Sequence, residues 1–175
     1  GSPAPAGDGA PIVLTVGSIF NRRHVDQLIR AFARVASQVP GARLVIVGEN
    51  RTHPHQDLGA LAQSLGIADR VDLRSYVSDD ELRALYRQAR AFAFLSTYEG
   101  FGLTPLEAIV AGVPTVVYDT EVAREVHAGL AHLVPNLPRQ LEMFTQRPAR
   151  QRFIDLVQIL VARYGADAFY EATPD

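Results

Sequence analysis

The sequence of 175 residues contains no cysteine and no lysine. Without cysteine, disulfides, thiol nucleophiles and zinc–thiolate sites are excluded, which is compatible with a reducing compartment. The basic side chains other than histidine are all arginines, and together with the many alanines this indicates a bacterial source with a GC-rich genome. No apolar run approaches the ~18 residues that a membrane-spanning helix needs. The net charge of −2 gives no electrostatic case for binding nucleic acid or an anionic membrane.

Motifs of several common enzyme classes are also missing. There is no Gly-x-x-x-x-Gly-Lys-Ser/Thr phosphate loop and no Gly-x-Gly-x-x-Gly after a predicted strand, so ATPases and dinucleotide dehydrogenases are poor matches. There is also no Gly-x-Ser-x-Gly elbow, so a hydrolase with that nucleophile motif is a poor match. The segment His53-Pro54-His55 offers two metal ligands, but without further ligands it is typical of a polar loop. We therefore expect no metal site.

The length is enough for one domain with a sizeable core. Residues 1–10 are rich in Gly, Pro and Ala, and the absence of an initiator Met suggests that Gly1-Ser2 is a tag remnant before a linker. We expect residues 11–175 to form the folded domain.

Hydrophobic patterns predict alternating strands and helices along this domain. Short apolar runs predict strands over residues 12–16, 43–48, 71–73, 91–95, 113–118 and 130–134. Helical spacing predicts helices over residues 25–39, 58–65, 78–89, 104–111, 121–127 and 153–164. This alternation predicts an α/β fold with a doubly wound parallel sheet of the Rossmann type. The loops 17–24, 49–53, 74–78 and 96–104 each follow a strand, so we expect them to share one edge of the sheet.

The loop over residues 96–104 combines two glycines with a predicted helix start. Gly100 and Gly102 can adopt backbone angles that other residues avoid. Thr104 is a good N-cap, Pro105 suits the first helical turn, and Glu107 follows the cap by three residues, which is the capping-box pattern. A helix N-terminus directly after a glycine turn favours an anion such as phosphate.

Residues 98–108 read Tyr-Glu-Gly-Phe-Gly-Leu-Thr-Pro-Leu-Glu-Ala, with Gly112, Pro114 and Thr115 following. This segment resembles the glutamate–seven residues–glutamate motif of family 4 retaining glycosyltransferases, which have the two-domain GT-B fold. The motif lies in their C-terminal, nucleotide-sugar-binding half. The resemblance therefore implies that the chain is a single C-terminal GT-B domain and that an N-terminal acceptor domain precedes it in the full enzyme.

The resemblance also implies roles for the residues of the turn. Glu99 would contact the hydroxyls of the transferred sugar near the reacting carbon, and Glu107 would accept hydrogen bonds from the ribose of the donor. Backbone N–H groups of four residues would hold the diphosphate or the sugar hydroxyls: Gly100, Phe101, Gly102 and Leu103. The alternatives are a solvated loop carboxylate for Glu99, a capping-box residue for Glu107 and an ordinary tight turn between them.

Further donor-binding residues are implied in two other loops. In the family, an Arg in the first loop and a Lys a few residues later neutralise the diphosphate. Arg23 aligns with that Lys, Ser18 stands where the family usually has its Arg, and Arg22 is the substitute. The alternative for Arg23 is a solvated arginine at a helix start, which the helix dipole disfavours. Tyr76 and Val77 would contact the base, or else form an ordinary loop-and-core pair.

The resemblance implies a transferase that moves a sugar from a nucleoside diphosphate sugar to an acceptor with retention. No Asp-x-Asp signature of metal-dependent glycosyltransferases occurs, so we expect chemistry without metal or cofactor, with arginine and the helix dipole replacing the cation. We expect a saccharide or lipid-linked saccharide acceptor, and a cytoplasmic enzyme with peripheral contact at the inner membrane as an alternative.

We also expect the isolated chain to bind nucleotide without turning over. Two other functions stay open: a non-catalytic nucleotide-binding module, and a GT-B-fold nucleotide-sugar epimerase.

Overall fold

The structure is a computed structural model and describes residues 10–99, 101–127 and 129–134. Residues 1–9 of the predicted linker, the predicted helix over 153–164 and Gly100 lie outside the described residues. None of the helices described before residue 135 combines the length and the apolar character that a membrane crossing requires.

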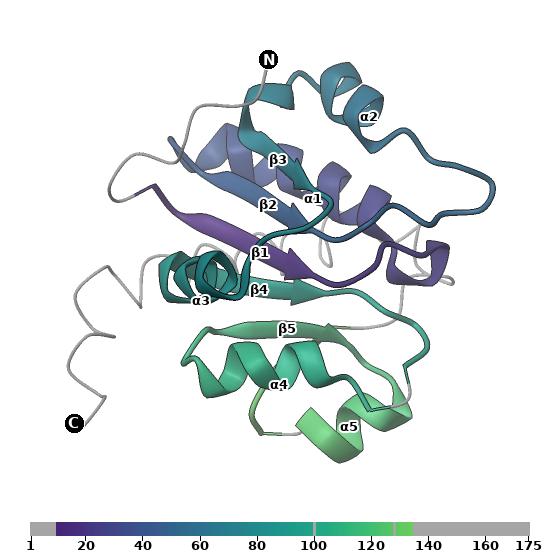
Figure 1. Ribbon diagram of the computed structural model, residues 1–175, viewed down its shortest axis with the longest axis vertical. Coiled ribbons are helices and arrows are strands. Elements are labelled where there is room, and N and C mark those ends of the chain that lie inside the picture. Colours follow the sequence, from purple (N-terminus) through teal and green to yellow (C-terminus); the bar gives the residue numbers. More distant parts are fainter. Residues whose placement is uncertain (1–9, 100, 128, 135–175) are drawn as a thin grey trace.

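A six-stranded parallel sheet forms the centre of the domain, in the strand order β3-β2-β1-β4-β5-β6 (Figure 1). The strands are β1 (Ile12–Val16), β2 (Arg43–Val47), β3 (Val71–Arg74), β4 (Ala89–Phe94), β5 (Thr115–Tyr118) and β6 (His132–Val134). The predicted doubly wound parallel sheet is therefore confirmed. β5 and β6 each begin two residues later than predicted, and in β5 the first paired residue, Thr115, directly follows Pro114.

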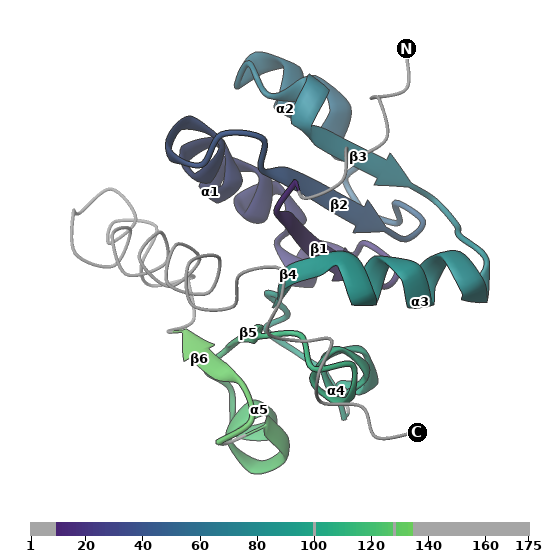
Figure 2. The same ribbon diagram turned by 90° about the vertical axis from the view of Figure 1, so that its left-hand side faces the viewer.

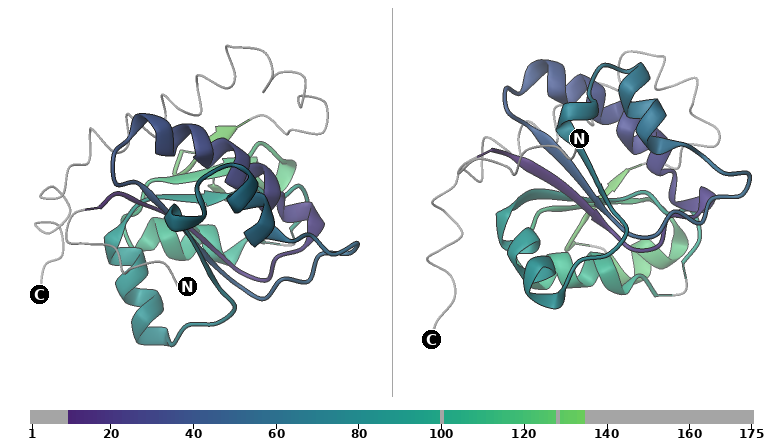
Figure 3. Two further views of the ribbon diagram at one scale, coloured as in Figure 1. Left: turned by 90° about the horizontal axis from the view of Figure 1, so that it is seen from above. Right: turned by 45° about the horizontal axis from the view of Figure 1, so that its top comes forward.

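Helices cover both faces of the sheet (Figures 2 and 3). They are α1 (Val25–Gln38), α2 (Leu58–Ser64), α3 (Asp79–Gln88), α4 (Leu103–Val110) and α5 (Glu121–His127), with short 3-10 turns at Asn21–Arg23 and Ala68–Arg70. α1 and α2 pack on one face, and α3, α4 and α5 pack on the other.

Successive residues of a strand point to opposite faces, and this explains the two cores. In β1, Val13 packs in the cluster with α1 and α2, whereas Leu14 packs in the cluster with α3 and α4. Both side chains are almost fully buried. All five residues of β1 are buried and four of them are apolar, which suits a sheet covered on both sides.

Two helix starts differ in how they are capped. Ser78 and Glu81 form a capping box at the start of α3. The predicted N-cap at Thr104 is wrong, because α4 begins at Leu103 and its N-cap is Gly102, with φ 76° and no capping side chain. The left-handed backbone of Gly102 turns the chain into the helix before Thr104 is reached.

The carboxyl ends of the strands bring the four predicted loops to one edge of the sheet, where the arrowheads of β1 to β5 point in Figure 1. Gly17 N–H donates to Val47 O at 2.8 Å, and Gly48 N–H donates to Arg74 O at 2.8 Å. Thr97 N–H donates to Arg22 O at 2.9 Å. The loops after β1, β2, β3 and β4 are thus joined by backbone hydrogen bonds.

Gly48 is where two of these loops come closest. Its φ is +154°, and a Cβ added there would lie 2.1 Å from Gly17 O. Only glycine fits, because that φ strains an L-residue and the neighbouring atom belongs to backbone that cannot rotate away.

We predict that Gly48→Ala lowers the free energy of unfolding by roughly 3 kcal/mol through this clash and the strained φ. Gly41→Ala is the matched control, since Gly41 has φ +78° but no atom within 4 Å of its Cβ position. It should cost about 1 kcal/mol, from the left-handed backbone alone. Urea unfolding of both variants measures the difference, and equal losses would contradict the clash.

His127 is a buried ionisable residue at the end of α5. Its side chain is 3% exposed, and its Nδ1 is buried without a hydrogen-bond partner among the described residues. Burial lowers the pKa of His127 below its ordinary 6.5, because the charged imidazolium loses its hydration. The native state therefore binds a proton less readily than the unfolded chain does.

It follows that the His127 contribution to the free energy of unfolding is complete above about pH 6.5 and is lost as the pH falls below it. We predict that His127→Asn flattens the fall in unfolding free energy between about pH 7.5 and about pH 5. His53→Asn, in the exposed loop after β2, is the control and should leave the slope as in the parent. Parallel slopes for all three proteins would rule out a role for His127.

Candidate functional site

The turn between β4 and α4 lies where the strand order of the sheet reverses. β1 pairs with β2 on one side and with β4 on the other, so the loops after β1 and β4 flank the switch point. In open α/β sheets, ligands bind in the crevice outside the carboxyl ends of the strands at this point. The predicted turn is therefore placed where the fold provides a binding crevice.

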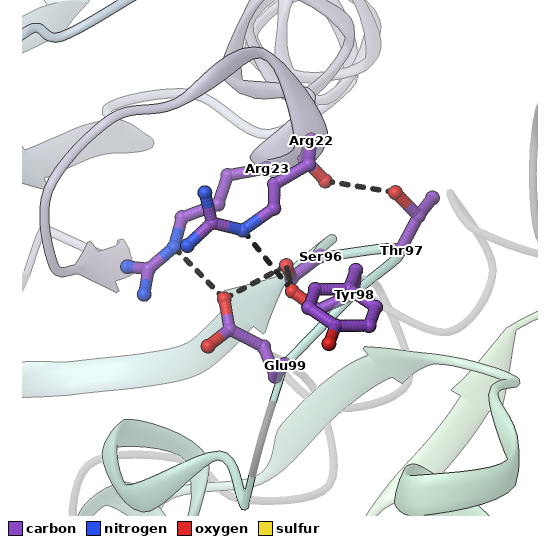
Figure 4. Close-up of polar contacts among 6 residues, drawn as sticks. All are labelled: Arg22, Arg23, Ser96, Thr97, Tyr98 and Glu99. Carbon is purple, nitrogen blue, oxygen red and sulfur yellow. Dashed lines mark hydrogen bonds and ion pairs between the residues drawn. The ribbon is translucent and has the colours of Figure 1, made fainter.

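Glu99 is held by two hydrogen bonds within this crevice (Figure 4). Its Oε1 accepts from Arg23 Nε at 3.1 Å and from Ser96 Oγ at 2.8 Å. The side chains of Arg23 and Glu99 are 16% and 21% exposed. Glu99 is thus not a freely solvated loop carboxylate, and the ion pair joins the loop after β1 to the loop after β4.

Arg23 lies mostly inside the protein. Its guanidinium stacks over the ring of Phe94, with 4.8 Å between Cζ and the ring centroid. A Cβ on Gly17 would lie 2.0 Å from Arg23 Nη1, so a larger residue at position 17 would displace the guanidinium from this place. Burial lowers the pKa of Arg23, and the neighbouring Glu99 opposes that shift.

The Nη1 atom of Arg23 is buried and has no hydrogen-bond partner among the described residues. Buried donors in native proteins are nearly always paired with protein, water or ligand, so each exception needs an explanation. Figure 4 shows Nε of Arg23 facing Glu99 and the terminal nitrogens turned away from it. The guanidinium therefore keeps donors that an anion could use.

Arg22 also joins the loop after β1 to the loop after β4. Its Nε donates to Tyr98 O at 3.1 Å, and its guanidinium lies 4.4 Å from the centre of the Phe20 ring. Its own carbonyl accepts from the N–H and the hydroxyl of Thr97. The side chain of Arg22 supports the turn in this structure.

Glu107 has a different partner from Glu99. It lies exposed on α4, five residues after the N-cap at Gly102, so it does not take the predicted capping-box position. Its Oε2 accepts from Tyr86 Oη of α3 at 3.1 Å. Burial raises the pKa of Tyr86, and the nearby carboxylate raises it further. No hydrogen bond between described residues links Glu107 to Glu99.

The remaining predicted residues divide by exposure. Phe101 and Leu103 flank Gly102 and are 55% and 65% exposed. Tyr76 is 81% exposed, whereas Val77 is buried in the core beside α3, so only the backbone of Val77 can face a ligand. The roles predicted for these four residues stay predictions. The same holds for Gly100 and for Ser18, which lies in the loop after β1 and is partly exposed.

A recess opens beside the turn, between the ends of β4 and β5 and α5. Its polar lining includes Ser96, Glu99, Thr120 and His127. The ring of His127 closes one wall, since its Nε2 would lie 3.0 Å from a Cβ on Gly102. Among the residues described up to 134, no three acidic or histidine side chains are grouped as a metal site would require.

Ser96, Tyr86 and His127 were not among the predicted site residues. Ser96 could have been found, because it directly follows a predicted strand three residues before Glu99. Tyr86 and His127 carry no such signal, since their partners Glu107 and Gly102 lie on other elements. Only the packed fold brings each pair together.

This chain resembles proteins of one known family. The sequence profile of the family described as "Glycosyl transferases group 1" matches residues 3–132. The chain is 36% identical over 125 residues to the mannosylfructose-phosphate synthase of Agrobacterium fabrum, covering 68% of this chain and 26% of that protein. It is 33% identical over 125 residues to the GDP-mannose:cellobiosyl-diphosphopolyprenol alpha-mannosyltransferase of Komagataeibacter xylinus, covering 71% and 32%. The chain thus spans about a quarter to a third of the length of these curated relatives.

Solved structures share the fold. The pneumococcal O-GlcNAc transferase GtfA, in complex with UDP and GlcNAc, superposes with a TM-score of 0.73 at 21% identity, covering 96% of this chain and 32% of that chain. The C-terminal domain of a glycosyl transferase group 1 family protein (LpcC) from Francisella tularensis gives a TM-score of 0.62 at 18% identity, covering 93% and 94%. With the family profile matching most of its length, this chain belongs to the group 1 glycosyl transferases.

Proposed function

We propose that the chain is the donor-binding, C-terminal domain of a retaining GT-B glycosyltransferase of family 4. The enzyme would move a sugar from a nucleoside diphosphate sugar to an acceptor. The observation that carries this proposal is the Arg23–Glu99 pair, a largely buried cation with an unpartnered donor beside a carboxylate at the switch point of the sheet. The cation suits the diphosphate of a nucleotide sugar, and the carboxylate suits the sugar hydroxyls.

Arg23 and the start of α4 would hold the diphosphate. The guanidinium fork matches phosphate oxygens, and it keeps its charge at every physiological pH. The first turn of α4 has no capping side chain and no acidic residue, so its N–H groups and the positive end of the helix dipole are available to an anion. Together they would stabilise the charge on the leaving diphosphate without a metal ion.

Glu99 would hold the transferred sugar. Its Oε1 is occupied by Arg23 and Ser96, while no described residue donates a hydrogen bond to Oε2. That oxygen can accept from a sugar hydroxyl next to the diphosphate. We assign Glu99 to binding and electrostatic support near the reacting carbon, and not to nucleophilic attack.

Glu107 would accept hydrogen bonds from the ribose, and Tyr76 with the backbone of Val77 would contact the base. The acceptor, a saccharide or a lipid-linked saccharide, would bind between this domain and an N-terminal domain of the same enzyme. The isolated chain should therefore bind nucleotide without transferring sugar.

One observation favours a second candidate function, a nucleotide-binding module without catalysis. Ser18 stands where the family usually places an arginine that neutralises the diphosphate. Arg22, the substitute, is engaged with Tyr98 O and lies over Phe20 in this structure. Sugar transfer by the full-length protein separates the two functions, because the module would bind the donor and form no product.

The proposal predicts that a nucleoside diphosphate stabilises the chain against unfolding. A ligand that binds only the folded state adds about 2.7 kcal/mol at a hundred times its dissociation constant. For a chain of this size that corresponds to a rise in Tm of roughly 5–10 °C. Thermal melts with UDP, GDP, ADP, dTDP and their sugar conjugates measure it, starting with GDP-mannose because one relative is named for it. A Tm that none of these compounds raises would contradict the proposal.

Removing the buried cation should weaken that binding. We predict that Arg23→Ala lowers the affinity for the nucleoside diphosphate by roughly 1.5–3 kcal/mol, the scale of a hydrogen bond to a charged group. Isothermal titration measures the loss. Arg30→Ala, which removes an exposed arginine from α1, is the charge-matched control and should bind as the parent does. Unchanged affinity in Arg23→Ala would remove Arg23 from the site.

A further inference from the structure

The hydrogen bond between Tyr86 of α3 and Glu107 of α4 joins a buried donor to an exposed acceptor. The ring of Tyr86 is 7% exposed and packs on Phe92, with 5.9 Å between ring centroids. Phe92 in turn stacks on Phe94 at 6.4 Å, below the guanidinium of Arg23. The hydroxyl of Tyr86 thus belongs to a row of packed, buried aromatic rings.

The partner of this hydroxyl is an exposed carboxylate. Tyr86 Oη donates to Glu107 Oε2 at 3.1 Å, so a fixed donor holds one oxygen of a side chain that would otherwise rotate freely. Burial and the adjacent carboxylate raise the pKa of Tyr86, so the phenol keeps its proton and can only donate here. The other oxygen of Glu107 receives no hydrogen bond from a described residue.

A glutamate on a helix surface loses considerable rotamer freedom when it binds a ligand. Holding it beforehand in the bound orientation removes that cost, which is the general benefit of preorganisation. A group anchored in the core is suited to this task, because its own rotamer is locked by packing.

We propose that Tyr86 is a positioning residue that orients Glu107 to accept hydrogen bonds from the ribose hydroxyls of the donor nucleotide. The inference rests on the proposed function, and it adds a residue that touches neither sugar nor phosphate. Tyr86 would thereby set the preference of the site for a ribonucleotide over a nucleotide that lacks both ribose hydroxyls.

The test compares two ligands on four proteins. The ligands are the nucleoside diphosphate that most stabilises the chain and its 2′,3′-dideoxy analogue. The proteins are the parent, Tyr86→Phe, Glu107→Ala and the double variant. Tyr86→Phe keeps the ring and its packing and removes only the hydroxyl, and isothermal titration gives each affinity.

The expected result is a loss of about threefold to tenfold in the affinity of Tyr86→Phe for the ribonucleotide, the scale of one ordinary hydrogen bond. Its affinity for the dideoxy analogue should match the parent's. In the Glu107→Ala background, Tyr86→Phe should cause no further loss, because the carboxylate that it orients is already gone.

Three results would overturn the role of Tyr86 alone: equal losses for both ligands, no loss for either, or a marked fall in Tm of Tyr86→Phe, which would show a purely structural hydroxyl. Absence of nucleotide binding by the parent chain would overturn the proposed function, and the role of Tyr86 with it. The two failures are therefore distinguishable.

Discussion

The ion pair between Arg23 and Glu99 connects the two halves of the candidate site. The arginine belongs to the loop after β1 and the glutamate to the loop after β4, so the pair crosses the gap where the sheet reverses its strand order. Its members are also the two residues whose chemistry suits the two ends of a sugar diphosphate. The charge that would attract phosphate and the acid that would hold sugar therefore constrain each other before any ligand arrives.

Glycine makes this closeness possible. Gly17 leaves space for the guanidinium of Arg23, and Gly48 lets the loop after β2 approach the backbone of Gly17. Gly102 then turns the chain directly into α4, which puts the helix start at the same edge. Each of these positions has a positive φ, so the site is built from backbone shapes as much as from side chains.

Much of the fold could be predicted from the sequence, because strands buried on both sides are continuous apolar runs and each helix has a regular apolar stripe. The start of α4 could not. Thr104, Pro105 and Glu107 fit a capping box locally, but Gly102 in the left-handed region initiates the helix first. Local propensity is a weak guide when the neighbouring turn decides where the helix begins.

Site residues that belong to the sequence motif could be predicted, whereas residues brought to the site only by packing could not. Glu99 and Glu107 stand out in the sequence, and Ser96 lies only three residues before the Glu99 that it contacts. Neither spacing nor composition reveals that Tyr86 donates to Glu107. These two residues lie on separate helices, and only the folded core sets their distance.

The closeness of Gly102 to His127 limits which substitutions the chain can accept at position 102. A methyl group at position 102 would press against the imidazole at 3.0 Å, and the imidazole is enclosed by the core behind it. A side chain at position 102 therefore requires the imidazole to move. The loop before α4 and the last residue of α5 are coupled in this way, although the core residues of α4 and β5 separate them in the chain.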